Sequence, residues 1–223
     1  SGLSQAMRPG QLHVSENAQA LLCRLITAHK RVHPAGTVLK LEGDDTGSVF
    51  LVLSGWLLAS KTLAEGQRQI IDIILSGGIL EPTSATPGVS ALEVGTLTEV
   101  RVAAIPRSRW HDACAQFREL ADLNHQISDA AMSRRAERMM RLGKAPAETV
   151  IAYALCELCL RSTARGLVAG TVFHIPMTQQ QLGDFCGLSA VHVCRTLRRL
   201  ERNEVLGVTD HMSVAVHDVE ALA

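Results

Sequence analysis

The sequence has no excess of charge of one sign, because 22 Lys and Arg residues balance 22 Asp and Glu residues. The whole chain therefore gives no sign of a nucleic-acid partner, and any basic surface must be local. Long apolar runs are also missing, since the longest, VFLVLSGWLLA, is interrupted by Ser54 and Gly55. With no N-terminal apolar segment of the secretory type, we expect a cytoplasmic protein that makes no membrane contact.

Motifs for catalysis are lacking as well. The sequence has no nucleophile elbow, no His and Glu residues at metal-binding spacing and no phosphate-cradling glycine loop. The six cysteines are scattered through segments with a helical pattern, which favours reduced thiols over a disulfide framework. A zinc site built on Cys156 and Cys159 would need a second pair. We therefore predict that the chain is not an enzyme and binds no metal.

What the sequence does contain is a helix-turn-helix pattern at Thr178 to Arg202, TQQQLGDFCGLSAVHVCRTLRRLER. Gly187 permits the left-handed backbone that ends one helix and turns into the next, and Gly183 is small enough for the two helices to cross closely. Thr178 and Ser189 are suitable N-caps for the two helices. This spacing predicts a DNA-reading device.

The second helix of this pair has one apolar and one basic face. At about 100° per residue, Val193, Leu197 and Leu200 share an inward stripe. Basic side chains lie on the opposite face, where arginines can reach guanine edges or phosphates and an apolar side chain can touch a thymine methyl group. An amphipathic helix with a solvated basic face is the alternative, which the glycine pair and the caps disfavour. The following residues, LGVT, DHM and SVAVHD, predict two short strands around a turn, as in a wing.

The segment from His33 to about Ile105 has a strand pattern. Short apolar runs such as TVLKL, VFLVLS, RQIIDIIL and EVRVAAI are separated by turn signals that include EGDDTG, AEG and SGG. This spacing predicts a β-roll, barrel or sandwich.

A helical pattern replaces the strand pattern at about residues 106–142. Leu120, Leu123, Ile127 and Ala130 recur at spacings of three and four. A helix of about 25 residues is longer than a small domain needs, so we expect this seam to pack against a second copy of the chain as a homodimer. A basic cluster follows in the same helix, and a solvated helix face is its simplest interpretation; it comprises Arg134, Arg135, Arg138, Arg141 and Lys144.

Two domains follow from these patterns. Gly143-Lys144-Ala145-Pro146 is expected to break the long helix and to serve as a hinge. We therefore predict an α+β protein with a β-roll sensor domain and dimer helix at residues 1–142, and a winged helix-turn-helix domain at residues 143–223. A further helix is expected at about residues 147–162.

In this order of elements the chain resembles the Crp/Fnr superfamily of bacterial transcription regulators. The resemblance covers nearly the whole chain and is carried by HPAGTVLKLEGD, VFLVLSGWL, Gly77-Gly78, LTEVRVAAIPRSRW, ALCEL and, most specifically, TQQQLGDFCGLSAVHVCRTLRRLE. It implies a homodimer that binds a two-fold symmetric operator in double-stranded DNA, with RNA polymerase as a further partner if the protein is an activator.

The resemblance also implies a set of DNA-contacting residues. Arg195 matches the base-reading arginine of the family, whereas Val191 stands where many members have a glutamate. Because valine cannot accept a hydrogen bond from cytosine N4, we expect the operator to differ at that base pair. The full set of expected contacts is Thr178, Gln179, Gln180, Ser189, Val191, His192, Arg195, Arg198 and Arg202.

The effector-binding pattern departs from that of the family. Members that bind cyclic nucleotides hold the phosphate with a glutamate after the glycine pair and an Arg-Ser couple. Here the corresponding residues are Gly77, Gly78, Glu81 (or Pro82) and Ser90, with no arginine. A buried phosphate needs such a charge, so cyclic AMP is not expected. Only Cys23 precedes the roll, which disfavours an iron–sulfur cluster. Haem stays open, although no pair among the nine histidines has a spacing that favours it.

Cys194 carries a separate hypothesis. It lies beside Arg195 on the helix predicted to read DNA, where neighbouring cations favour a thiolate. Oxidation would add bulk and negative charge close to the phosphates, so we expect loss of DNA binding on oxidation. The alternative is a small residue tolerated at the helix edge.

Two functions remain open at the level of sequence. The first is a sequence-specific transcription regulator whose roll senses an unidentified effector or whose cysteine senses redox state. The second is a constitutive DNA-binding dimer whose roll is only a structural platform. Loss of the phosphate-binding arginine favours the second.

Overall fold

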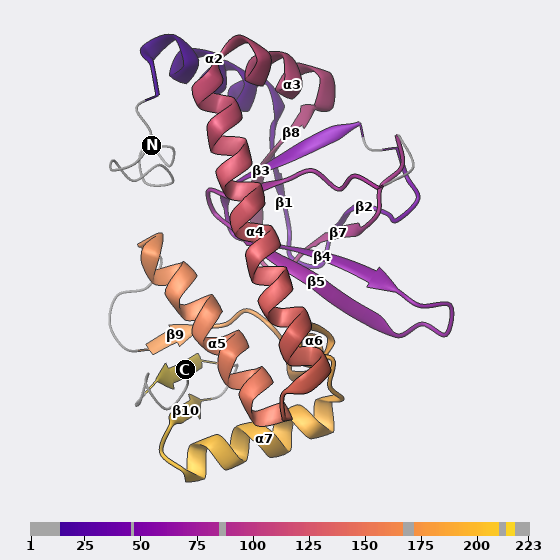
Figure 1. Cartoon of the computed structure of the whole chain (residues 1–223), viewed down its shortest axis with the longest axis vertical. Helices are drawn as coiled ribbons and strands as arrows, with labels where there is room; N and C mark the ends of the chain where they lie inside the picture. The colour runs from indigo at the N-terminus through magenta and orange to yellow at the C-terminus, as the bar shows by residue number, and fades with distance from the viewer. Residues whose placement is uncertain (1–13, 46, 85–87, 167–171, 210–212, 217–223) are drawn as a thin grey trace. The chain divides into compact units, whose positions relative to one another are not determined.

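The computed structural model describes residues 14–45, 47–84, 88–166, 172–209 and 213–216, and the chain divides into two compact units (Figure 1). The first comprises Ser1–Lys61 and Asp72–Ser133, and the second comprises Thr62–Ile71 and Arg134–Ala223. The two runs of the second unit lie more than 60 residues apart in sequence. The compact units do not coincide with the domains of residues 1–142 and 143–223, which stay a prediction.

Two four-stranded sheets form the N-terminal β-roll, so the predicted α+β architecture is confirmed. Their strands belong to the first unit except for Thr62 and residues 68–71, which belong to the second. The first sheet has the order β1-β8-β3-β6 and the second β2-β7-β4-β5. All the pairings resolved residue by residue are antiparallel. The strands are β1 Lys30–His33, β2 Val38–Lys40, β3 Ser48–Ser54, β4 Trp56–Thr62, β5 Arg68–Leu75, β6 Ile79–Leu80, β7 Glu93–Thr96 and β8 Val100–Pro106.

Strand β3 is buried on both faces, which explains its continuous apolar run. Successive side chains of a strand point to opposite sides. Phe50 and Val52 enter a core that draws residues from both sheets, whereas Val49 and Leu51 enter a second core on the helical side. A strand that is buried on both faces therefore has an unbroken apolar sequence rather than an alternation of apolar and polar residues.

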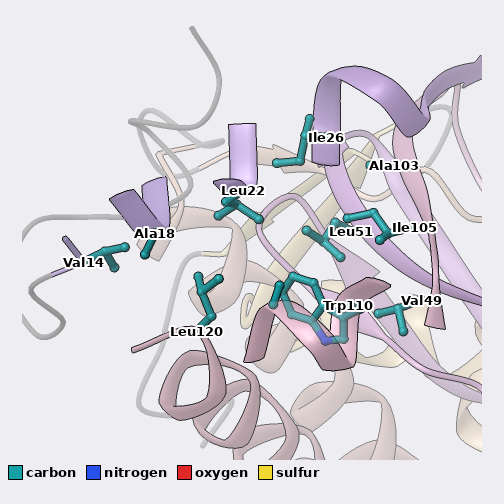
Figure 2. Close-up of a cluster of buried hydrophobic side chains, with 11 residues drawn as sticks. Val14, Ala18, Leu22, Ile26, Val49, Leu51, Ala103, Ile105, Trp110 and Leu120 are labelled. Carbon is teal, nitrogen blue, oxygen red and sulfur yellow. The ribbon is translucent and has the colours of Figure 1, made fainter. Parts of the chain in front are cut away.

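The second of these cores joins the first sheet to helices (Figure 2). Helix α2, Glu16–His29, contributes Ala18, Leu22 and Ile26 at spacings of four residues, and Trp110 fills the space between them and the sheet. Helix α2 is not among the elements expected from the sequence. Its signal was available, because Ser15 caps the helix by accepting a hydrogen bond from the Ala18 N–H, and the apolar residues recur every four positions.

The predicted single helix over residues 106–142 was wrong in its bounds. It consists of α3, Arg107–Gln116, and α4, Arg118–Lys144, separated by Phe117 in an extended conformation with φ −128° and ψ 110°. Phe117 packs against the core around Trp110, so the chain leaves the helix there. At its other end α4 continues through Gly143 to Lys144, and the predicted break begins only at Ala145.

The predicted dimer seam needs a correction at Leu120. This residue is fully buried in the core of its own protomer (Figure 2), because α4 begins against that core. Leu120 therefore cannot contribute to an interface. Leu123 and Ile127 are half-buried and Ala130 is exposed, so these three residues stay available for one.

The second unit contains the end of α4 and the remaining helices, α5 Ala147–Ala164, α6 Gln179–Cys186 and α7 Ala190–Arg202. A small sheet of order β10-β11-β9 completes it, with β9 Val172–His174, β10 Leu206–Thr209 and β11 Ser213–Val216. The predicted helix near 147–162 and the two strands LGVT and SVAV are confirmed. The turn DHM and the last two residues of SVAVHD lie outside the described residues.

Within the ranges described, no helix is both long enough and apolar enough to span a bilayer.

Candidate nucleic-acid interface

Helix α6 and helix α7 are joined by a turn whose geometry the sequence specifies residue by residue. Thr178 accepts a hydrogen bond from the Gln181 N–H, while the Gln181 side chain accepts one from the Thr178 N–H at 2.8 Å, so a full capping box starts α6. Gly187 ends α6 with φ 66° and ψ 32°, a left-handed conformation that costs glycine little. The Leu188 N–H then donates to the Gly183 carbonyl at 2.9 Å. The predicted helix-turn-helix is therefore confirmed.

Gly183 lies at the closest approach in this turn. A methyl group built on its Cα would overlap the carbonyl oxygen of Leu188, which is a backbone atom and cannot rotate away. Only glycine allows α6 to approach the start of α7 this closely, as the spacing predicted.

Helix α7 has the two faces expected from its sequence. Val193, Leu197 and Leu200 are at most 3% exposed, and Ser189 caps the helix by accepting from the His192 N–H at 3.2 Å. The helix therefore packs by one apolar stripe and leaves its arginines in solvent. All the residues predicted to contact DNA are exposed, namely Thr178, Gln179, Gln180, Ser189, Val191, His192, Arg195, Arg198 and Arg202.

Two hollows lie along the basic face of α7. One, of about 870 Å³, is lined by the start of α5 and by Arg195 and Arg199, and the other, of about 580 Å³, is lined mainly by the arginines of α7. Two acidic residues lie nearby: Glu148 pairs with Arg199 of this face at 3.4 Å, and Glu201 accepts a hydrogen bond from the Val208 N–H of β10 at 3.0 Å. Glu201 thus fixes the predicted wing to the helix, a role that sequence spacing did not indicate.

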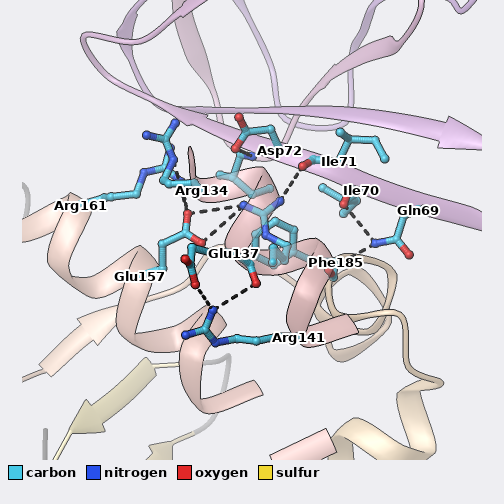
Figure 3. A network of polar contacts seen from close by, with 12 residues as sticks. Gln69, Ile70, Ile71, Asp72, Arg134, Glu137, Arg141, Glu157, Arg161 and Phe185 are labelled. Atoms are coloured by element: carbon cyan, nitrogen blue, oxygen red, sulfur yellow. Dashed lines mark hydrogen bonds and ion pairs between the residues drawn. The ribbon is translucent and has the colours of Figure 1, made fainter. Parts of the chain in front are cut away.

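The basic cluster of α4 is only partly a solvated helix face: Arg135 and Lys144 are exposed as that interpretation predicts, whereas Arg138 is buried and Arg134 and Arg141 are half-buried. Arg138 is 5% exposed, and its guanidinium lies 3.4 Å from Glu157 of α5 and 4.0 Å from the centre of the Phe185 ring (Figure 3). Arg134 and Arg161 also lie near Glu157, at 3.6 and 2.9 Å. These arginines converge on the buried carboxylate of Glu157, which lies 19 residues further along the chain from Arg138 and attracts them.

The residues predicted to hold an effector make contacts within the protein. Glu81 accepts from Arg107 Nε at 2.5 Å and lies 3.2 Å from His111 Nε2, and the buried Ser90 hydroxyl donates to the Leu92 carbonyl at 2.7 Å. The N–H groups of Gly77 and Gly78 donate to backbone carbonyls at 2.8 and 2.9 Å. The sequence has no Lys or Arg from residue 77 to residue 100. These residues do not fit a nucleotide phosphate, which needs charged or free donors.

All six cysteines are free thiols, as expected, in different environments. Burial raises the pKa of Cys186 to about 12, and burial also raises the pKa values of Cys156 and Cys159. Cys194 is half-exposed on α7. Among the residues that the structure describes, no group of three or more His, Cys, Asp or Glu side chains is placed to hold a metal ion.

Comparisons with known proteins agree with this geometry. The family model of the Crp-like helix-turn-helix domain matches residues 151–223, and that of the cyclic nucleotide-binding domain matches residues 30–117. The nitrogen fixation regulation protein FixK of Bradyrhizobium diazoefficiens is 31% identical over 199 residues, which cover 87% of this chain and 82% of FixK. The transcriptional activator protein FnrA of Stutzerimonas stutzeri is 27% identical over 171 residues, which cover 77% of this chain and 70% of FnrA.

A solved structure shares the fold. That of FixK2 from Bradyrhizobium japonicum superposes with a TM-score of 0.75 at 21% identity, and the match covers 86% of this chain and 94% of FixK2. The capped helix-turn-helix, the matching family models and the FixK identity together show that this chain belongs to the Crp/Fnr superfamily and is a sequence-specific DNA-binding transcription regulator rather than an enzyme.

Proposed function

We propose that the protein binds a two-fold symmetric operator as a homodimer, with the α7 helices of the two protomers in successive major grooves about 34 Å apart. The observation that carries this proposal is the exposed basic face of α7 opposite its buried apolar stripe. Leu123, Ile127 and Ala130 of α4 are the proposed dimer seam. As a DNA-binding regulator the protein would act in the cytoplasm. The relative FnrA is named a transcriptional activator. If this protein also activates transcription, RNA polymerase would be a partner.

Each exposed side chain has a proposed role at the operator. Arg195 donates its two parallel N–H groups to a guanine edge, and Val191 contacts a thymine methyl group. The Thr178 and Ser189 hydroxyls already accept cap hydrogen bonds, so their O–H groups stay free to donate to phosphates. Arg198, Arg202, His192, Gln179 and Gln180 supply further phosphate contacts.

Selection of DNA sites from a random pool, combined with sedimentation of the enriched complex, tests this proposal. We expect an enriched palindrome bound by two protomers. At the base pair that Val191 faces, we expect a base other than the cytosine that a glutamate would recognise. Enrichment of no palindrome, or a complex with one protomer, would contradict it.

Arg195→Lys is expected to lower operator affinity by roughly ten- to a hundredfold, because lysine keeps the charge and loses the two-pronged guanine contact worth about 1–3 kcal/mol. Binding to random DNA should stay unchanged, since phosphate attraction persists. Fluorescence anisotropy with operator and scrambled duplexes measures both affinities. Arg109→Lys, on the exposed surface of α3, is the matched control and should change neither. An equal loss on both duplexes would show that Arg195 contacts only phosphate.

We propose that the roll binds no cyclic AMP, because its internal hydrogen bonds occupy Glu81, Ser90 and the glycine pair. Either another effector binds, and must then prefer the DNA-competent arrangement, or the protein is constitutive and the roll is a structural platform. Operator affinity measured across small-molecule and oxidant panels separates the two. An unchanged affinity throughout supports the constitutive protein.

We further propose that Cys194 is a redox switch of DNA binding. With hydrogen peroxide as oxidant, the thiolate attacks one peroxide oxygen, the O–O bond breaks, hydroxide leaves and a sulfenic acid remains. Cys186 is an unreactive alternative, since it is buried and its pKa is about 12, so that it carries almost no thiolate at neutral pH.

Brief peroxide treatment is expected to lower the operator affinity of the wild type at least roughly tenfold and to leave Cys194→Ser unaffected, because the added oxygen stands against the phosphates. Anisotropy before and after treatment, with thiol reduction to test reversal, is the measurement. Cys23→Ser removes an exposed thiol of α2 and should behave as the wild type. Equal inactivation of wild type and Cys194→Ser would refute the switch.

A further inference from the structure

The segment Thr62–Ile71 belongs to the second compact unit although it lies more than 60 residues before the rest of that unit. Its Arg68 points its guanidinium at helix α6, with Nε 3.0 Å and Nη2 2.9 Å from Oδ2 of Asp184. The Asp184 side chain is only 11% exposed. A carboxylate so far removed from water needs a charged partner, and Arg68 supplies it.

The other oxygen of Asp184 holds Gln180. The Gln180 Nε2 group, one turn earlier on α6, donates to Asp184 Oδ1 at 2.8 Å. Because an ionised carboxylate only accepts hydrogen bonds, it selects the NH2 end of the Gln180 amide and fixes the orientation of that group. One N–H is used in this bond and the second is free to donate outward. Gln180 itself is exposed at the start of α6.

Further contacts hold the same segment against α6. Gln69 donates to the Phe185 carbonyl at 3.3 Å, and Arg138 donates to the Ile71 carbonyl at 2.5 Å while its guanidinium lies over the Phe185 ring (Figure 3). The chain is thereby held at Gln69 and Ile71, directly after Arg68. Arg68 is presented to Asp184 from a fixed position rather than from a free loop.

We propose that Arg68 is a positioning residue for DNA binding, acting through Asp184 to orient the amide of Gln180 toward a phosphate. This relay, Arg68–Asp184–Gln180, makes a segment of strand β5 part of the DNA-reading head, by which we mean the helix pair α6 and α7. It rests on the proposed function in one respect, namely that Gln180 contacts a phosphate. Arg68 itself does not touch DNA in this account.

A double-mutant cycle on operator affinity tests the relay. We expect Arg68→Ala and Gln180→Ala each to weaken operator binding about three- to tenfold, and the double variant to be no weaker than Gln180→Ala alone. Arg68→Lys, which restores a charge and one donor to Asp184, should recover part of the loss. The slope of log affinity against log salt concentration should be the same for Arg68→Ala and wild type, because no phosphate contact of Arg68 is lost.

Two controls separate a relay from other roles. Lys61→Ala removes a positive charge that pairs with Glu42 on the exposed surface, and should leave operator affinity unchanged. Hydrogen exchange of α6 and α7 should be equal in wild type and Arg68→Lys. Equal exchange would show that both proteins are folded alike, so that a difference in affinity does not come from unfolding.

Three outcomes would overturn the relay. If the affinity losses of the two single variants multiply in the double variant, Arg68 and Gln180 act independently. If the slope of log affinity against log salt concentration is lower by about one in Arg68→Ala, Arg68 contacts a phosphate itself. Unchanged affinity of Gln180→Ala would remove the end of the relay. In each case Arg195→Lys still tests whether α7 recognises the operator sequence. Failure of the relay is therefore distinguishable from failure of the proposed function.

Discussion

Glu157→Gln is expected to destabilise the second unit by about 3–5 kcal/mol, a large share of the margin of a typical domain. The side chain of Glu157 is 6% exposed and lies within 3.6 Å of three arginines, Arg134, Arg138 and Arg161. Glutamine keeps the shape and removes the negative charge, so the guanidinium groups are left crowded together away from water. Operator binding should fall with stability, because α5 supports both helices of the DNA-reading head.

The two units can be monitored separately in this experiment. Both tryptophans, Trp56 and Trp110, lie in the first unit, so their fluorescence reports unfolding of that unit. Hydrogen exchange of α5, α6 and α7 reports the second. In Glu157→Gln the urea midpoint of the second unit should therefore move to a lower concentration, while the midpoint reported by tryptophan fluorescence stays unchanged.

Glu137→Gln is the matched control, since it removes the same charge one helix away. Glu137 pairs with Arg141 at 2.5 Å, but its side chain is 54% exposed. An exposed i,i+4 pair contributes about 0.5 kcal/mol or less, so this variant should unfold almost as the wild type does. Equal destabilisation by the two variants would show that burial of Glu157 is not the cause.

Features governed by neighbouring residues could be predicted from the sequence. The helix-turn-helix depends on caps, a left-handed glycine and a 3.6-residue period, all of which lie within Thr178–Arg202. The roll was predictable for the same reason, because turn signals and short apolar runs alternate along the chain. Helix α2 shows that a local signal can also be overlooked, since its cap and its period are both present.

Features governed by distant partners could not be predicted in this way. The arginines of α4 have the spacing of a solvent-exposed face, and only the position of Glu157 in α5 turns two of them inward. Arg68 and Asp184 lie 116 residues apart, and no periodicity joins them. Leu120 satisfies the seam pattern and yet enters the core beside Trp110, because α4 starts against its own sheet.

Gly183→Ala is expected to destabilise the second unit by about 1–3 kcal/mol and to lower operator affinity roughly tenfold or more. Alanine favours a helix over glycine by up to about 1 kcal/mol, but its methyl group would meet the Leu188 carbonyl, so α7 must move away from α6. A displaced α7 changes the spacing between its arginines and Thr178 at the start of α6. Urea unfolding and anisotropy with operator DNA measure the two effects.

The same substitution at Gly143 should have the opposite sign. Gly143 is helical in α4 and has open space where a methyl group would stand, so alanine should stabilise the second unit by roughly 0.5–1 kcal/mol through helix propensity alone. Because the two variants differ only in what the new methyl group meets, their difference isolates the close approach of the helices. A stabilising effect of Gly183→Ala would mean that α7 can move without cost, and the turn would then not fix the position of Arg195 over the DNA.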